Sequence, residues 1–216
     1  MPKIIVFLGP SLPLDEARRI VDATFRPPAA RGDMTRAVDD GAEIICLIDG
    51  VFFQECAVGH REILSALERG VRVIGASSMG ALRSAELDTL GMEGIGVIYH
   101  MYRQGVVESD DEVAVIFDPV SGSPLSEPMV NIRATLQKAA ERGVLDPVSH
   151  DALLRAALLL YYPDRTYDRI CEEASNVVAH GVIERFLAFT AKERVDLKAD
   201  DARQALEYVR NLAGVQ

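Results

Sequence analysis

The sequence predicts an α/β protein in which a parallel-rich sheet is layered with helices and a helical C-terminal part follows. Three short apolar runs, rich in β-branched side chains, contain or border a glycine at residues 3–9, 43–50 and 71–77. Such continuous runs are typical of buried parallel strands. Between the second and third runs, CAVGHREILSALERG spaces its apolar residues as a helix and ends at Gly70. Strand, helix and strand in about 30 residues form a βαβ unit, whose strands are parallel.

The segments around the first strand fit the same layered arrangement. After the first run, LDEARRIVDA at 14–23 predicts a helix. The next segment, ATFRPPAARGDMTRA, interrupts the pattern because Pro27 and Pro28 prevent regular helix. Its Gly32 and Asp33 indicate a turn or the N-cap of a following helix.

The second half of the chain is expected to be mostly helical. A glycine-rich stretch, LGMEGIG, precedes a helix containing Tyr99 and Tyr102, and EVAVIFD at 112–118 is a possible fourth strand. From Ser126 onward the pattern is helical almost throughout. We therefore expect an α/β core over residues 1–125 and a helical extension over 126–216 packed on it.

The composition indicates a globular chain with 49% hydrophobic and 26% charged residues. A formal net charge of −10 argues against nonspecific binding to nucleic acid or to an acidic membrane. The cysteines Cys46, Cys56 and Cys171 are odd in number and have no CxxC spacing, so no disulfide framework is implied and a reduced, cytoplasmic setting is favoured. The apolar residues 1–9 are too short for a signal peptide, and no apolar run is long enough to cross a membrane, so we expect a soluble protein with no membrane partner.

Small polar residues follow all three predicted strands. Ser11 lies in GPS, Asp49 in DG, and Ser77 and Ser78 in SSMG. The carboxyl ends of parallel strands meet at one edge of a sheet, where ligands of α/β proteins bind. We therefore expect Ser11, Asp49 and Ser77 to bind substrate at this edge. The alternative is that turn geometry alone selects these residues.

Ser78 is the candidate nucleophile. ASSMG resembles the G-x-S-x-G elbow, with Ala76 at the first glycine, in which a tight strand-to-helix turn projects a serine beside a helix N-terminus. Backbone amides at that terminus can stabilise an oxyanion. The alternative is that Ser77 or Ser78 only caps the helix.

A serine nucleophile needs a neighbour that accepts its proton, and GHREIL offers His60 and Arg61. Histidine exchanges protons near neutral pH, although His60 also fits a half-buried position on the helix. Cys56 lies four residues before His60, but two ligands are weak evidence for a metal, so we expect no metal and no cofactor. Arg31 and Arg83 are candidates for substrate binding, while a solvated charged face is the alternative.

Several motifs together resemble the TfuA-like family. They occur in the family's order over roughly residues 4–137: FLGPSLP, PPAARGD, LIDGVFF, GHREIL, GASSMGALRSAEL with GMEGIG, DDEVA and SEPMVNIRATL. Each motif alone is weak, whereas their ordered succession is specific.

The resemblance implies a partner of a YcaO enzyme in peptide backbone thioamidation. YcaO enzymes use ATP and Mg²⁺ to activate an amide oxygen, which sulfur replaces. The TfuA-like partner is associated with hydrolysis of a thiocarboxylated ThiS-type sulfur carrier, which releases sulfide, and with helping YcaO engage its peptide substrate.

The family's proposed catalytic pair is a serine and a lysine. Ser78 matches the serine, but the family's H-K-E-I-L is H-R-E-I-L here, so Arg61 stands where the lysine is expected. Arginine does not serve as a neutral base. Four alternatives follow: His60 accepts the proton, a lysine distant in sequence folds into the site, Arg61 only orients the thiocarboxylate, or the protein has lost hydrolysis.

Two other classes of function compete with the hydrolase. One is a non-catalytic adaptor that binds YcaO and its peptide. The other is a binder of nucleotide or phosphate through GASSMG, which is disfavoured because neither a Walker lysine nor GxGxxG accompanies these glycines.

Overall fold

The chain folds into two compact units. In the computed structural model, which describes residues 2–52, 56–118 and 120–214, the sheet unit comprises Met1–Asp110 and Lys198–Gln216, and the helical unit comprises Asp111–Leu197. The chain thus returns to the sheet unit for its last helix, whereas the sequence predicted one helical extension from residue 126. The last residue of the LIDGVFF motif, Phe53, lies outside the described residues.

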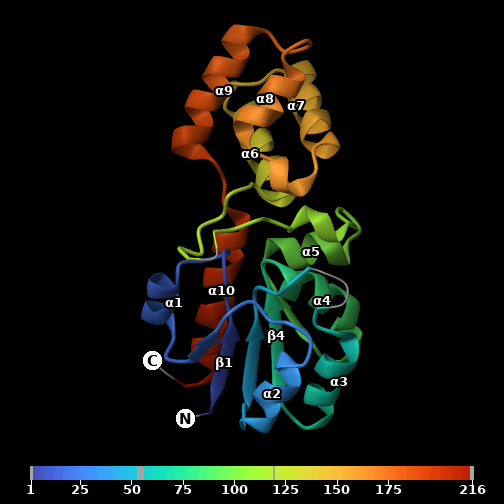
Figure 1. Ribbon diagram of the computed structural model, residues 1–216, viewed down its shortest axis with the longest axis vertical. Helices are drawn as coiled ribbons and strands as arrows, with labels where there is room; N and C mark the ends of the chain where they lie inside the picture. Colours follow the sequence, from blue (N-terminus) through green and yellow to red (C-terminus); the bar gives the residue numbers. More distant parts are fainter. Residues whose placement is uncertain (1, 53–55, 119, 215–216) are drawn as a thin grey trace. The chain divides into compact units, whose positions relative to one another are not determined.

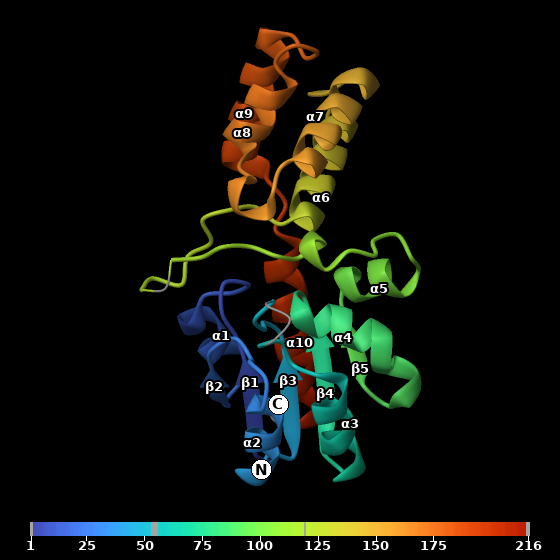
Figure 2. The ribbon, with the colours of Figure 1, turned by 45° about the vertical axis from the view of Figure 1, so that its right-hand side comes forward.

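The sheet unit contains a parallel sheet (Figure 1), whose strands, among the described residues, follow the order β2-β1-β3-β4-β5 (Figure 2). This confirms the α/β class and the three predicted strands. The two short edge strands, β2 and β5, were not predicted. The strands are β1 Ile4–Phe7, β2 Thr24–Arg26, β3 Ile44–Leu47, β4 Arg72–Ala76 and β5 Glu93–Ile95.

The prediction of a strand at 112–118 is wrong. Asp110–Glu112 form a 3₁₀ turn, and the run that follows contributes only an isolated bridge between Phe117 and Pro124. Val113 is buried and the Ile116 N–H donates to the Ser126 hydroxyl at 3.0 Å. The run is apolar because part of it is buried, and its backbone finds partners outside a sheet.

Helices cover both faces of the sheet. Successive residues of a strand point to opposite faces, so a continuous apolar strand makes both faces apolar. Ile4 and Val6 of β1 belong to a core shared with Leu206 of α10, while Ile5 and Phe7 belong to the opposite core. The second core includes residues of α2 and α3. The helices of this unit are α1 Leu14–Ile20, α2 Asp33–Asp39, α3 His60–Glu68, α4 Met79–Leu87 and α5 Val97–Arg103, and α10 Leu197–Leu212 begins at the last residue of the helical unit.

The helical unit has a core of its own, to which Leu136, Leu153 and Phe186 belong. Its buried Arg165 donates to the carbonyls of Ala157 and Leu160 at the end of a helix. No helix in the described part of the chain is both long and apolar enough to span a membrane. The helices are α6 Met129–Glu141, α7 Pro147–Leu159, α8 Tyr167–Ala174 and α9 His180–Glu193.

Gly80 is the residue at which α4 approaches the sheet most closely, and Gly80→Ala is expected to destabilise the protein strongly. A Cβ at this position would lie 1.7 Å from the Leu47 carbonyl oxygen, and backbone atoms cannot move aside as a side chain can. Overpacking of this kind costs about 3 kcal/mol or more, which urea unfolding measures. Gly181→Ala in α9 is the control, because a Cβ there would meet only the Arg185 side chain, at 3.8 Å. Equal stability of wild type and Gly80→Ala would contradict this packing.

Candidate functional site

The carboxylate of Asp49 fixes the loop that follows β1. Its Oδ2 accepts hydrogen bonds from the backbone N–H groups of Gly9 at 2.8 Å and Ser11 at 3.1 Å, and its Oδ1 accepts one from the Ser11 hydroxyl at 2.7 Å. Both Asp49 and Ser11 are buried. The chain adds β2 on one side of β1 and β3 on the other, so the gap between β1 and β3 is the topological switch point of the sheet. Open α/β sheets bind their ligands at this point. Ser11 and Asp49 therefore meet at the predicted edge.

The turn between β4 and α4 is a strained elbow. The Ser78 N–H donates to the Ala76 carbonyl at 2.7 Å, which closes a three-residue turn centred on Ser77. Ser77 has a φ of 66° and is the one non-glycine residue with positive φ among the described residues. Three-residue turns of this hand are rare and strained, and such strain clusters at functional sites. The turn lies where the nucleophile elbow was predicted, but the strained residue is Ser77, which directly precedes the candidate nucleophile Ser78.

Neither serine of the elbow caps α4 through its hydroxyl. The Ser77 hydroxyl donates to the Lys198 carbonyl at 2.8 Å. Ser78 occupies the N-cap position, but its side chain makes no capping hydrogen bond, although it is buried. A simple helix cap, the alternative reading of these residues, therefore accounts for neither hydroxyl.

Lys198 is the site residue that local sequence motifs missed. It lies in the first turn of α10, and its Nζ is 4.0 Å from Asp49 Oδ1, with 4% of the lysine side chain and 3% of the aspartate side chain exposed. The Lys198 backbone also accepts the bond from Ser77. The sequence signal that could have found Lys198 is the scarcity of lysine, because the chain has only four lysines, at positions 3, 138, 192 and 198. A lysine distant in sequence is one of the four alternatives for the missing lysine, and Lys198 is a buried lysine beside Asp49 at the strand ends.

The predicted base His60 lies in a different cluster. Its Nε2 is 2.7 Å from Glu86 Oε2, which also accepts a hydrogen bond from Arg83 Nη1 at 2.7 Å. The His60 side chain is 49% exposed, and Arg61 is exposed as well. Glu86 lies two turns beyond Ser78, about 12 Å along the helix axis. The structure therefore groups His60 with Arg83 and Glu86 at the far end of α4.

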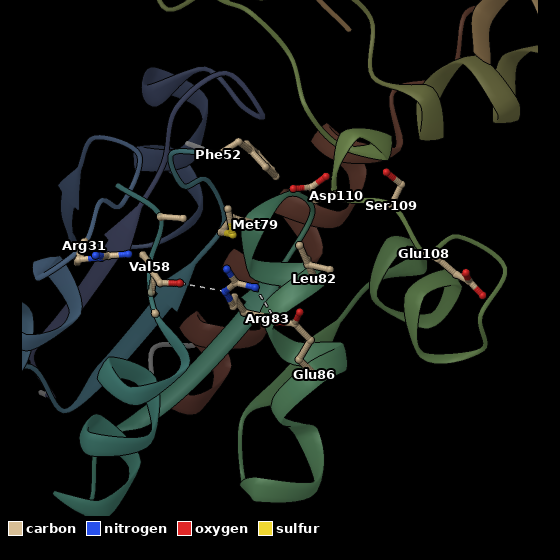
Figure 3. Close-up of a pocket in the computed structure, with 12 residues that line it drawn as sticks. Arg31, Phe52, Val58, Met79, Leu82, Arg83, Glu86, Glu108, Ser109 and Asp110 are labelled. Atoms are coloured by element: carbon tan, nitrogen blue, oxygen red, sulfur yellow. Dashed lines mark hydrogen bonds and ion pairs between the residues drawn. The ribbon is translucent and has the colours of Figure 1, made fainter. Parts of the chain in front are cut away.

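A pocket of ≈ 520 Å³ opens beside the first turns of α4 (Figure 3). Met79, the residue after Ser78, forms part of its wall, whereas the buried Ser78 does not line it. Arg31 and Arg83 both line it, and the Arg83 Nε is held by the Val58 carbonyl at 3.0 Å. The remaining lining residues are Phe52, Ala57, Val58, Gly59, Leu82, Glu86, Glu108, Ser109 and Asp110.

The cysteines do not form a reactive or metal-binding cluster in the described part of the chain. Burial raises the pKa of the Cys46 thiol to about 12, so this thiol stays protonated at neutral pH. Cys56 is exposed. Within the described ranges, no three His, Cys, Asp or Glu side chains lie close enough together to hold a metal ion.

The fold and the site define a parallel α/β protein with a serine elbow and a buried lysine at one sheet edge. The sequence model of the TfuA-like protein family matches residues 49–166, more than half of the chain, and the chain belongs to this family. No curated protein is similar enough to the chain to count as a match. Membership of the family implies a role with YcaO enzymes in thioamidation.

Proposed function

We propose that this protein hydrolyses the thiocarboxylated C-terminus of a ThiS-type sulfur carrier and supplies the released sulfide to a YcaO enzyme. The observation that supports the proposal is the buried Lys198. Its carbonyl accepts a hydrogen bond from Ser77, the residue before Ser78, and its Nζ lies 4.0 Å from Asp49 Oδ1. A serine with a lysine is the catalytic pair that the family resemblance implies. We also propose that the protein helps the YcaO enzyme to engage its peptide substrate.

In the proposed reaction, Ser78 Oγ attacks the thiocarboxylate carbon and forms a C–O bond. Its proton passes to the Lys198 amine, which then gives it to the sulfur as the C–S bond breaks, so that hydrosulfide leaves. Water next attacks the acyl-serine ester, giving the carrier carboxylate, a free Ser78 hydroxyl and a proton. One water is consumed and sulfur is exchanged for oxygen without any change of oxidation state.

Two further groups support these steps. Asp49, 4.0 Å from Lys198 Nζ, stabilises the ammonium that forms when the lysine takes the proton. The Met79 N–H lies at the first position of α4, where a backbone amide has no acceptor within the helix. Such an amide is suited to stabilise the oxyanion of the tetrahedral intermediate.

The pocket beside Met79 is the proposed binding site for the end of the carrier. Arg31 and Arg83 line it and supply guanidinium groups that can pair with a thiocarboxylate. The hydrogen bonds from Arg83 to Val58 and Glu86 hold that side chain in place before substrate arrives.

Purified protein is expected to convert a thiocarboxylated carrier into its carboxylate and an equal amount of sulfide, without ATP or YcaO. Mass spectrometry of the carrier follows the exchange of one sulfur for one oxygen, and a sulfide assay follows the product. A carrier that ends in an ordinary carboxylate is the control and releases no sulfide.

The same preparation also distinguishes the adaptor. A protein that stimulates thioamidation by the YcaO enzyme with free sulfide, yet leaves the thiocarboxylate intact, is the adaptor, and the hydrolase proposal is then wrong.

A further inference from the structure

The first turn of α10 is tied to the start of α5 by the buried carboxylate of Asp201. Its two oxygens accept hydrogen bonds from the backbone N–H groups of Val97 and Ile98, each at 2.8 Å. These amides begin α5 and have no acceptor within that helix. The Asp201 side chain thus accepts hydrogen bonds from two backbone N–H groups that find no acceptor within α5.

The residue before α5 is shaped to admit this carboxylate. Gly96 has a φ of 97°, and a Cβ at this position would lie 2.3 Å from Asp201 Cγ. Asp201 is 2% exposed, and burial raises its pKa while the two backbone hydrogen bonds act in the opposite direction. The contact is therefore close, buried and specific to a side chain with two acceptor oxygens.

Asp201 lies one turn after Lys198, and residues three apart share a helix face. The same turn of α10 is thus held at three points: Lys198 Nζ at Asp49, the Lys198 carbonyl at Ser77, and Asp201 at α5. The helix α5 in turn packs against α4, which begins directly after Ser78.

We propose that Asp201 is a positioning residue that holds Lys198 in register with Ser78. This inference rests on the proposed function, since it assigns Lys198 its part in the hydrolysis. Without the tie to α5, the first turn of α10 keeps its contacts at the strand ends but loses the restraint on its far side. Lys198 Nζ then occupies a range of positions, and proton transfer needs one of them.

The test is the Asp201→Asn variant, which keeps the shape but presents an amide N–H₂ group to one of the two backbone donors. We expect kcat for thiocarboxylate hydrolysis to fall about 10²-fold, the usual effect of a displacement near 1 Å, while KM stays nearly constant. Two controls share the helix. Asp200→Asn makes the same change at an exposed neighbour, and Val209→Ala removes buried methyl groups from the far part of α10.

Val209→Ala separates positioning from stability. We expect it to destabilise the protein and to keep kcat near wild type. Equal losses of kcat in Asp201→Asn and Val209→Ala would reduce Asp201 to a stability contact and overturn the inference.

A second measurement does not depend on activity. An amine-reactive ester, followed by peptide mass spectrometry, compares labelling of the buried Lys198 with that of the exposed Lys192 in the folded proteins. We expect Lys198 labelling to rise several-fold in Asp201→Asn but not in Val209→Ala or Asp200→Asn. If the wild type does not hydrolyse the carrier, the proposed function fails and labelling alone decides. Unchanged Lys198 labelling in Asp201→Asn would then refute the positioning role.

Discussion

Ser78→Ala is expected to abolish hydrolysis of the thiocarboxylated carrier while leaving the fold intact. Removal of a nucleophile lowers turnover by about 10³-fold or more, because the covalent route is lost. The Ser78 side chain makes no capping hydrogen bond, so its loss should change the free energy of unfolding by less than about 1 kcal/mol. Sulfide release and urea unfolding, measured on the same preparation, give the two quantities separately.

Ser77→Ala is the matched control and should show the opposite pattern. Its hydroxyl donates to the buried Lys198 carbonyl, and loss of that bond costs about 1–3 kcal/mol of stability. Turnover should remain measurable, since the Ser78 hydroxyl is retained. If Ser77→Ala were inactive and Ser78→Ala active, the nucleophile would be Ser77. Wild-type turnover in both variants would place the nucleophile outside this elbow.

Lys198→Met is expected to remove hydrolysis as completely as Ser78→Ala, because methionine fills similar space without a proton-accepting amine. The variant also removes the buried partner of Asp49, and breaking a buried pair from one side costs about 3–5 kcal/mol of stability. Activity and stability are therefore measured together, below the unfolding transition. Lys192→Met, the same change at an exposed position, should alter neither quantity.

A double variant separates the chemistry of Lys198 from its ion pair. Asp49→Asn with Lys198→Met replaces both members of the pair, so it should recover part of the lost stability and none of the activity. His60→Ala tests the other candidate base, and we expect it to keep turnover, since His60 contacts Glu86. If His60→Ala were inactive and Lys198→Met active, the proton acceptor would be His60.

The apolar patterning predicted the central part of the sheet well. β1, β3 and β4 are buried on both faces, so their sequences are continuous apolar runs that stand out. The edge strands have no such signal: β2 is TFR beside two prolines, and β5 is EGI in a glycine-rich stretch. Their pairing is set by the neighbouring strand and not by their own composition.

The candidate site divides in the same way. Ser11, Asp49 and the elbow serines follow strands directly, so the rule that parallel strands end at one edge brings them together. No local pattern links Lys198 to them, because 120 residues separate it from Ser78 and the connection depends on where α10 packs. Asp201 was missed for the same reason, since its partners are backbone amides of a helix that begins 104 residues earlier.

The return of α10 to the sheet has a consequence for synthesis of the protein. Apolar residues of β1, β3 and β4 share their core with α10, which the ribosome makes only after the entire helical unit. A nascent chain that already contains β1 to β5 therefore still exposes the part of this apolar face that α10 covers, and exposed apolar surface invites association with other chains. The helical unit has its own core and can fold during this interval. When α10 is complete, it covers the exposed part of this face and brings Lys198 to Asp49 at the same time. Chains arrested before this helix would therefore be prone to aggregate and would also lack the lysine.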